Sequence, residues 1–394
     1  MQVTFGGHAY LFVNPKYKGK YFPPSEAKAG QWFNYGGDKL WPLPEGHGAG
    51  EWPGPISDVL DDGEYEFSVV SQGATCTVRL QGPADPATGL QYSREISIGS
   101  GSPEISFHAV MKNASDRPIR WSIQSVTQYD TANSQDSGRY NHDFWAFAPV
   151  NAHSAYLDGY HVRAGLADDP SFEIKDGLFR LHWLYLQNEV WLDSDAGWIA
   201  VVDDATKYAV VERFDYAREA EYPGKASVIF YKNGAAIELD ESGTPRLRSA
   251  GPQQVPYYME AELNSPMISL NPGASFMMET HWFPARTSKE LKTVTAAGVI
   301  EEPLSAWATP QGLHLSGEFG VFFPGKLVAR ISDAAGSELG VVGLQSVDPL
   351  KETRLDQTFK AAANAYSVSV RLVDEGGIDR GTLGEAKISK SEAR

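Results

Sequence analysis

Hydrophobic residues alternate with polar ones, or gather in short apolar runs, along most of the 394-residue chain. Runs of this kind, bounded by turn residues, are typical of β-strands. No segment with helical periodicity longer than about 10 residues precedes position 287. The pattern therefore predicts an all-β fold. The predicted strands of this part are 64–70, 75–80, 92–98, 104–113, 119–128, 179–185, 198–202, 209–214, 227–231, 257–263 and 275–282.

One helix signal interrupts this rhythm. Thr287 and Glu290 have the spacing of a capping box, in which the two side chains satisfy the first free N–H groups of a helix. Gly298 stands where such a helix would end. We therefore predict a linker with a short helix over residues 287–302.

Strand-like runs resume after this linker, at intervals of roughly 8–12 residues, which are typical of a small antiparallel sandwich of immunoglobulin-like type. The chain is therefore predicted to contain a large antiparallel β domain over residues 1–286 and a small β-sandwich over residues 303–394. The predicted strands of the second part are 313–319, 326–331, 339–344, 353–359 and 365–373.

Net charge and hydropathy argue against two classes of interaction, nucleic-acid binding and a membrane span. The chain has Lys+Arg 34 against Asp+Glu 50, a net charge of −16. This argues against a nucleic-acid partner, because affinity for a phosphate backbone depends on clustered Lys and Arg. No apolar run approaches the roughly 20 residues of a membrane span. No signal-peptide pattern opens the chain, so the compartment stays open, with a periplasmic or secreted location if a leader has been removed.

Cysteine usage and motif content bear on cofactors and metals. Cys76 is the only cysteine, which excludes an intramolecular disulfide and a multi-cysteine metal site. No dinucleotide fingerprint, phosphate loop or His-x-x-x-His spacing on a helix occurs. We therefore expect no cofactor and no bound metal.

A segment around two adjacent glycines, Gly36 and Gly37, carries the densest group of candidate binding residues. Such glycines allow positive φ or a close approach to a ligand. Aromatic residues stand on both sides of them, and a carboxylate and an ammonium follow directly. Aromatic faces stack on sugar C–H groups, while charged side chains bind the hydroxyls. The alternative is a structural turn between two strands. The candidate carbohydrate-binding residues are Trp32, Tyr35, Asp38, Lys39 and Trp41.

Two carboxylates stand two positions apart on a predicted strand. Period-2 geometry directs Glu260 and Glu262 to the same face. Neighbouring carboxylates raise each other's proton affinity, and burial adds to this effect, which is how a general acid or base is tuned. The pair is therefore a candidate catalytic base, with the choice between the two residues open. The alternative is a solvated polar face.

His142 is the candidate acid among the histidines. It lies between aromatic residues and next to Asp143, whose carboxylate can orient the imidazole ring. The alternative is a loop on the protein surface, as it is for His153 and His161.

Four landmarks in order give the chain a family resemblance. They are residues 34–42 with their Gly-Gly and Trp-Pro pairs, the turn at 62–67, the turn at 113–118 with the following strand, and 259–262 with the turn at 270–273. Over residues ~5–285 the chain resembles the galactose mutarotase-like (aldose epimerase) superfamily, and within it an uncharacterised bacterial branch that shares the Gly-Gly-Asp-Lys-Leu-Trp-Pro run. The resemblance implies a β-supersandwich that binds sugars on a concave face, with a catalytic glutamate in the 259–262 segment.

The chain departs from this family at the acid. Epimerases of the superfamily pair a glutamate base with a histidine acid, and this chain has Thr127 and Gln128 where the histidine is expected. Gln128 is thereby a candidate substrate-binding residue rather than a proton donor. Asp62 likewise replaces a histidine. The acid is then missing unless His142, His153 or Asp143 supplies it.

Two functions follow from these observations. The first is an aldose 1-epimerase-like isomerase, or a related sugar-acting enzyme, with Glu260 or Glu262 as base. The second is a non-catalytic carbohydrate-binding or structural protein with the same fold. The expected partner is a carbohydrate ligand, whose identity the sequence does not specify; it does not specify the oligomeric state either.

Overall fold

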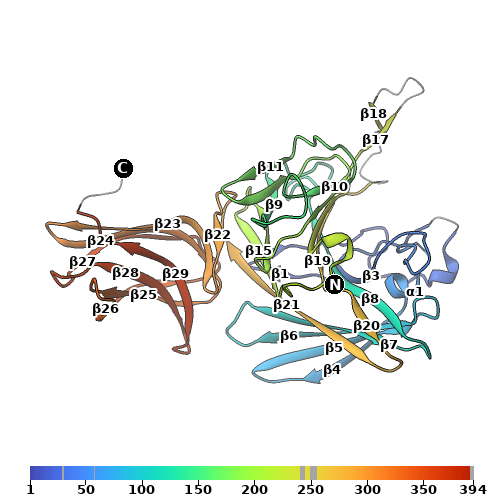
Figure 1. Ribbon diagram of the computed structural model, residues 1–394, viewed down its shortest axis with the longest axis horizontal. Helices are drawn as coiled ribbons and strands as arrows, with labels where there is room; N and C mark the ends of the chain where they lie inside the picture. The colour runs from blue at the N-terminus through green and yellow to red at the C-terminus, as the bar shows by residue number, and fades with distance from the viewer. Residues whose placement is uncertain (29–30, 57, 240–244, 249–254, 391–394) are drawn as a thin grey trace. The chain divides into compact units, whose positions relative to one another are not determined.

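The computed structural model describes residues 1–28, 31–56, 58–239, 245–248 and 255–390. Its regular structure is almost entirely antiparallel β, so the prediction of an all-β chain is confirmed (Figure 1). The residues cluster in two compact units. The first contains Met1–Ile98, Ile105–Ala200 and Glu212–Trp282, and the second contains Gly99–Glu104, Val201–Val211 and Phe283–Arg394.

A seven-stranded sheet of the first unit carries the segments singled out in the sequence. Its central strand β8 pairs with both β19 and β3. These strands are rich in β-branched and aromatic residues, which fit a pleated and buried surface. The order along the sheet is β10 (His161–Ala164), β13 (Asn188–Leu192), β16 (Val228–Lys232), β19 (Tyr258–Asn264), β8 (Ile119–Asp130) and β20 (Ile268–Leu270), with β3 (Asp38–Leu43) also on β8.

A ten-stranded antiparallel sheet forms the second layer. The predicted strands at 75–80, 92–98, 104–113 and 275–282 all lie in it, which confirms them. Its order is β11 (Phe172–Lys175), β12 (Leu178–His182), β9 (Phe144–Pro149), β14 (Trp198–Asp203), β15 (Tyr208–Phe214), β21 (Ser275–Arg286), β7 (Ile105–Asn113), β6 (Leu90–Gly99), β5 (Thr75–Ala84) and β4 (Glu66–Ser71).

Polar contacts join the facing layers of the first unit. Arg94 on β6 forms a buried ion pair with Asp38 on β3 and donates to the Ser125 hydroxyl over 3.1 Å. The Tyr129 hydroxyl on β8 donates to Glu212 on β15 over 2.6 Å. Because side chains alternate along a strand, the neighbouring positions of β3, β8 and β19 point to the other face of the seven-stranded sheet.

The remaining elements of the first unit are short. None of the helices among the residues that the structure describes is long and apolar enough to span a membrane. These elements are the strand pairs β1 (Thr4–Phe5) with β2 (His8–Ala9) and β17 (Ala236–Leu239) with β18 (Pro245–Arg248), the α-helix α1 (Val59–Asp62), and the 3-10 helices η1 (Pro24–Glu26) and η2 (Pro223–Lys225).

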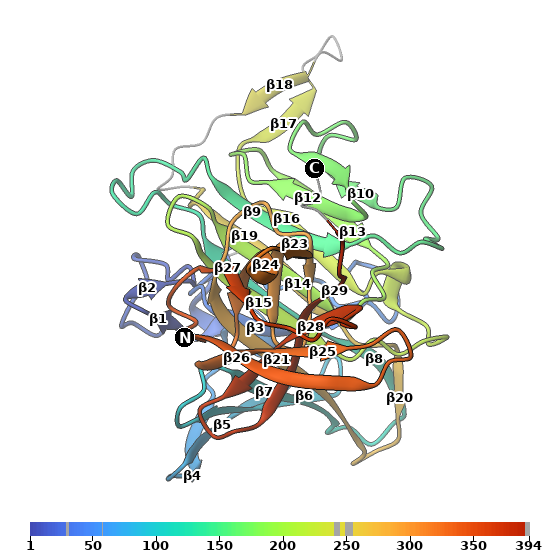
Figure 2. The ribbon, with the colours of Figure 1, turned by 90° about the vertical axis from the view of Figure 1, so that its left-hand side faces the viewer.

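The second unit contains a small β-sandwich of two four-stranded sheets (Figure 2). Buried and less buried positions alternate along β24 of one sheet and along β25 and β28 of the other, so one face of each sheet is buried. Its assignment to the immunoglobulin-like type stays a prediction. The sheets are β22 (Thr293–Val294), β23 (Gly298–Thr309), β24 (Gly312–Val321) and β27 (Thr353–Phe359), and β26 (Glu338–Val347), β25 (Gly325–Ser332), β28 (Ser367–Asp374) and β29 (Asp379–Lys387).

The predicted helix within the linker 287–302 is wrong. Thr287 donates its hydroxyl to Glu301 on β23 over 2.9 Å, and Ser288 also donates to that carboxylate, so no capping box with Glu290 forms. Gly298 begins β23 instead of ending a helix. The tertiary partner Glu301 thus replaces the local capping interaction, and the β-branched residues of β22 continue in extended form.

Candidate functional site

The floor of the candidate site is one face of the seven-stranded sheet. Strand registers place Glu189, Tyr231, Glu260 and Gln128 in one row across β13, β16, β19 and β8. A second row contains Trp191, Ile229, Glu262, Val126 and Lys39. Segments more than 200 residues apart, β3 and β19, thus contribute to the same face because both pair with β8.

A cavity of about 460 Å³ opens on this face, within the usual size range of ligand sites. We call it the carboxyl cavity. Its aromatic walls contain Trp32, Trp41, Trp191, Tyr231 and Tyr258. Its carboxyl groups come from Glu45, Glu189, Glu260 and Glu262, and Arg163 and His47 also line it. Flat apolar walls with convergent polar groups suit a polyhydroxylated ring.

Glutamine amides hold the two central carboxyl groups in place. The Gln128 side chain donates to Glu260 over 2.6 Å, and the Gln124 side chain donates to Glu262. Glu260 and Glu262 are each 5% exposed, which is buried for a charged residue. Both carboxyl groups therefore have fixed positions at the bottom of the cavity.

Burial dominates the protonation of this pair. Desolvation raises the pKa of Glu260 to about 8, and the amide of Gln128 and the charge of Lys39 only partly oppose it. Desolvation, followed by the charges of Glu260, Glu189 and Glu45, raises the pKa of Glu262 well above its ordinary value. The raised pKa values therefore favour the protonated form of both carboxyl groups at neutral pH, and Glu260 ionises as the pH rises past about 8.

Two further acidic residues, Glu45 and Glu189, line the cavity. Glu45 is an exposed residue, but desolvation of its carboxyl group, followed by the charge of Glu189, raises its pKa to about 7. Desolvation also raises the pKa of Glu189, against a 2.5 Å hydrogen bond from the Trp191 indole. Arg163 lies 5.9 Å from the Trp191 ring centroid, and its positive charge lowers the pKa of both carboxyl groups.

Asp61 connects the residues of the Gly-Gly segment. Its carboxylate accepts from the Lys39 ammonium over 2.8 Å, from the Trp41 indole over 2.7 Å and from the Trp32 indole over 2.5 Å. The one-turn helix α1 supplies Asp61, and the Asp58 side chain caps this helix by accepting from the Leu60 N–H over 2.7 Å. Asp61 thereby fixes both tryptophans as cavity walls.

The structure places four of the candidates outside the cavity lining. Asp38 points to the opposite face of β3, where Arg94 binds it, and the Tyr35 hydroxyl bonds with the backbone of Phe22. Lys39 forms an ion pair with Asp61, and Gln128 lies beside Glu260 on the neighbouring strand and donates to it. Roles in direct ligand contact for these residues therefore lack support from their positions.

His142 is also absent from the lining of the carboxyl cavity. It is exposed, and its ring lies 4.1 Å from the Tyr140 ring, between centroids. Its backbone carbonyl contacts the His182 ring over 2.5 Å. The structure thus does not bring His142 together with Glu260 and Glu262.

Sequence reasoning missed several lining residues that come from other segments. Glu189 and Trp191 stand two apart on β13, so their period-2 spacing was a usable signal of a shared face. Glu45, His47 and Arg163 lie in a loop or at the strand irregularity of β10, where periodicity gives no signal. Among the residues that the structure describes, no cluster of three or more His, Cys, Asp or Glu could hold a metal ion.

We predict that the protein loses stability as the pH rises from about 5 to 8.5. Groups with a raised pKa, among them Glu260 and Glu212, both at about 8, bind protons more tightly in the folded chain than in the unfolded chain. The stabilisation that these protonated groups give the folded chain is therefore complete below about pH 4.5. As the pH rises from there towards 8, the free energy of unfolding falls by up to about 1.4 kcal/mol per pH unit for each group. Urea unfolding across this range measures it.

The Glu260→Gln variant isolates one part of this dependence. Its slope of stability against pH is expected to be flatter than that of the unaltered protein, because the amide does not titrate. Glu66→Gln is the matched control, since Glu66 is exposed on the edge strand β4. A slope unchanged by Glu260→Gln would contradict the raised pKa.

Comparisons with known proteins give likenesses of fold only. No protein-family model matches the chain, and no curated protein sequence matches it. A TPR-domain containing protein from Parabacteroides distasonis is 14% identical with a TM-score of 0.39, over 63% of this chain and only 37% of that one. A protein from Synechocystis sp. is 9% identical with a TM-score of 0.46, over 73% of this chain and 88% of that one.

Several of the similar solved structures are galactose mutarotase-like proteins. One is a galactose mutarotase related enzyme from Lactobacillus acidophilus, 12% identical with a TM-score of 0.38, over 73% of this chain and 91% of that one. At these identities and TM-scores the likenesses assign neither a family nor an activity to this chain.

Proposed function

We propose that the protein binds a carbohydrate in the carboxyl cavity and that Glu260 and Glu262 transfer protons on the bound sugar, as in an aldose 1-epimerase-like isomerase. The observation that carries this proposal is the placement of two buried carboxyl groups, both with raised pKa, at the bottom of a cavity with tryptophan walls. A proton-transfer group works best when its pKa lies near the working pH.

The proposed reaction needs one base and one acid. Ionised Glu260 takes the proton of the anomeric hydroxyl, the bond between the anomeric carbon and the ring oxygen breaks, and protonated Glu262 gives its proton to that oxygen. Ring closure on the other face of the aldehyde reverses both transfers, so atoms and charges balance. His47, an exposed residue that also lines the cavity, is a second candidate for the acid.

The second candidate function is carbohydrate binding without turnover. The observation that favours it is the exposed position of His142, outside the lining of the cavity. In that case the carboxyl groups and glutamines serve only as hydrogen-bond partners for sugar hydroxyls, and the raised pKa values reflect burial alone.

We predict that freshly dissolved aldoses mutarotate faster in the presence of the protein than in buffer of the same pH. Polarimetry of glucose, galactose, mannose and galacturonic acid checks this, with calorimetry on the same sugars to measure binding. The protein-dependent rate is expected to rise between about pH 6.5 and 9, because Glu260 becomes ionised in this range. Binding without acceleration would favour the second candidate, and neither binding nor acceleration would overturn both.

A further inference from the structure

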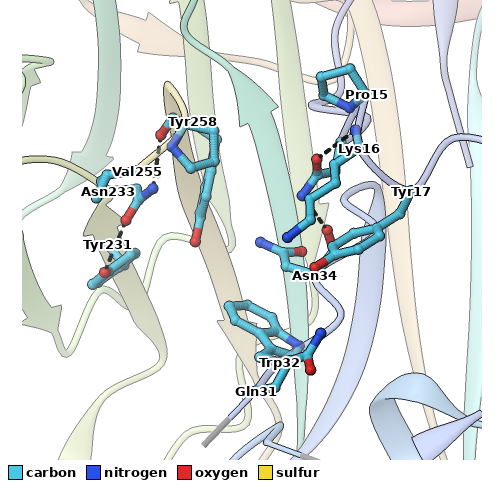
Figure 3. Close-up of a pocket in the computed structure, with 12 residues that line it drawn as sticks. Pro15, Lys16, Tyr17, Gln31, Trp32, Asn34, Tyr231, Asn233, Val255 and Tyr258 are labelled. Carbon is cyan, nitrogen blue, oxygen red and sulfur yellow. Dashed lines mark hydrogen bonds between the residues drawn. The ribbon is translucent and has the colours of Figure 1, made fainter. Parts of the chain in front are cut away.

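A second cavity, of about 810 Å³, is shown in Figure 3. Its lining residues Tyr231 and Tyr258 lie on the same sheet face as Glu260. The two cavities share three aromatic residues, Trp32, Tyr231 and Tyr258. Figure 3 shows Asn233 and Tyr258 on one side of the second cavity and Lys16 and Asn34 on the other. We call it the amide cavity, after its lining residues Asn14, Gln31, Asn34 and Asn233.

The two cavities follow one another along the same strands. On β19, Glu262 and Glu260 line the carboxyl cavity, and Tyr258, the next residue on this face, lines both. On the neighbouring β16 side, Tyr231 lines both cavities and Asn233 lines the amide cavity. Four residues of a strand span about 13 Å, which exceeds one sugar ring of about 5 Å. The face is therefore long enough for more than one ring.

The chemistry changes from one cavity to the next. The carboxyl cavity contains four glutamates, whereas the residues described as lining the amide cavity include no carboxylate. Their polar groups are amides, tyrosine hydroxyls and the Lys16 ammonium, which lies 5.0 Å from the Tyr17 ring centroid. Such groups recognise hydroxyl and ring oxygens, but they cannot act as a base on a sugar.

We propose that the amide cavity is a second sugar subsite, so that the ligand is an oligosaccharide whose first unit occupies the carboxyl cavity and whose next unit occupies the amide cavity. This inference rests on the proposed function of the carboxyl cavity. Tyr231 and Tyr258 lie where the two units join, and Trp32 forms a wall for both. Proton transfer takes place on the unit next to Glu260, and the second unit supplies binding free energy.

Calorimetry with matched sugars tests the proposal. The probes are glucose and galactose, with cellobiose, maltose, lactose and their trisaccharide homologues. The best disaccharide or trisaccharide is expected to bind about 10-fold or more tightly than the best monosaccharide. The double variant Lys16→Ala/Gln31→Ala should lose most of this gain and change monosaccharide binding less than about twofold. Lys18→Ala is the control, because Lys18 is exposed but does not line the cavity.

The outcomes separate this inference from the proposed function. Equal affinity for monosaccharides and oligosaccharides, or a gain that the double variant leaves intact, would overturn the second subsite while leaving the first cavity as a sugar site. Absence of binding for every probe would overturn both. Thermal unfolding of each variant verifies that a lost gain does not come from a loss of the fold.

Discussion

Replacing Glu260 by glutamine is expected to lower the protein-dependent mutarotation rate by a factor of about 10²–10⁴, the usual contribution of a general base. Sugar binding should largely persist, because glutamine has nearly the same shape and keeps one oxygen that can accept a hydrogen bond. Gln128 now donates to Glu260 over 2.6 Å, and it can donate to the amide oxygen of the variant in the same way. Polarimetry of the best aldose, together with calorimetry on the same sample, measures both quantities.

Two further variants test which residue is the acid. Glu262→Gln should also lower the rate if Glu262 is the acid, whereas His47→Ala should lower it if His47 has that role. Glu66→Gln is the control, because Glu66 is exposed on the edge strand β4. A Glu260→Gln variant with unchanged rate would remove Glu260 as the base. If the unaltered protein does not accelerate mutarotation, and Glu260→Gln changes only the affinity for the sugar, the protein is a carbohydrate-binding protein without turnover.

Replacing Arg94 by methionine is expected to destabilise the protein by about 3–5 kcal/mol, because it leaves a buried carboxylate without its partner. The side chains of Arg94 and Asp38 are 6% and 1% exposed, respectively. Desolvation already raises the pKa of Asp38, and the Arg94 charge is the main opposing effect. In the variant, Asp38 must be protonated or remain charged without compensation. Urea unfolding at pH 7 measures the loss.

Arg79→Met provides the matched control for this ion pair. Arg79 on β5 pairs with Glu95, but the two side chains are 48% and 28% exposed, so we expect a loss of only about 0–1 kcal/mol. The Arg94→Met/Asp38→Leu double variant should recover much of the stability, since no buried charge remains in it. A loss below about 1 kcal/mol for Arg94→Met alone would show that the pair contributes no more than a surface pair.

The strand content of the chain could be predicted because it depends on a local pattern. Alternating apolar and polar positions are encoded within five to ten neighbouring residues, and the predicted strands 119–128 and 257–263 correspond to β8 and β19. The same period-2 rule placed Glu260 and Glu262 on one face. These features needed no knowledge of distant partners.

The predicted helix shows how a tertiary contact overrides a local signal. Thr287 and Glu290 have the spacing of a capping box in the sequence. In the folded chain, however, the Thr287 hydroxyl donates to a different acceptor. Glu301, brought close by the hairpin of β22 and β23, accepts from both Thr287 and Ser288. Local propensity is only a weak preference, which a buried charge-assisted hydrogen bond outweighs.

The sequence by itself determined the all-β class, the shared face of the two central glutamates and the aromatic character of the Gly-Gly segment. Only the tertiary structure decided which residues complete the site. Glu45 and Glu189 reach the cavity from segments far apart, Asp61 engages Lys39, and Asp38 turns to the opposite face toward Arg94. The physical reason is that the period-2 pattern shows which face of its own strand a residue occupies. It does not show which strands pair, and strand pairing brings together residues that are far apart along the chain.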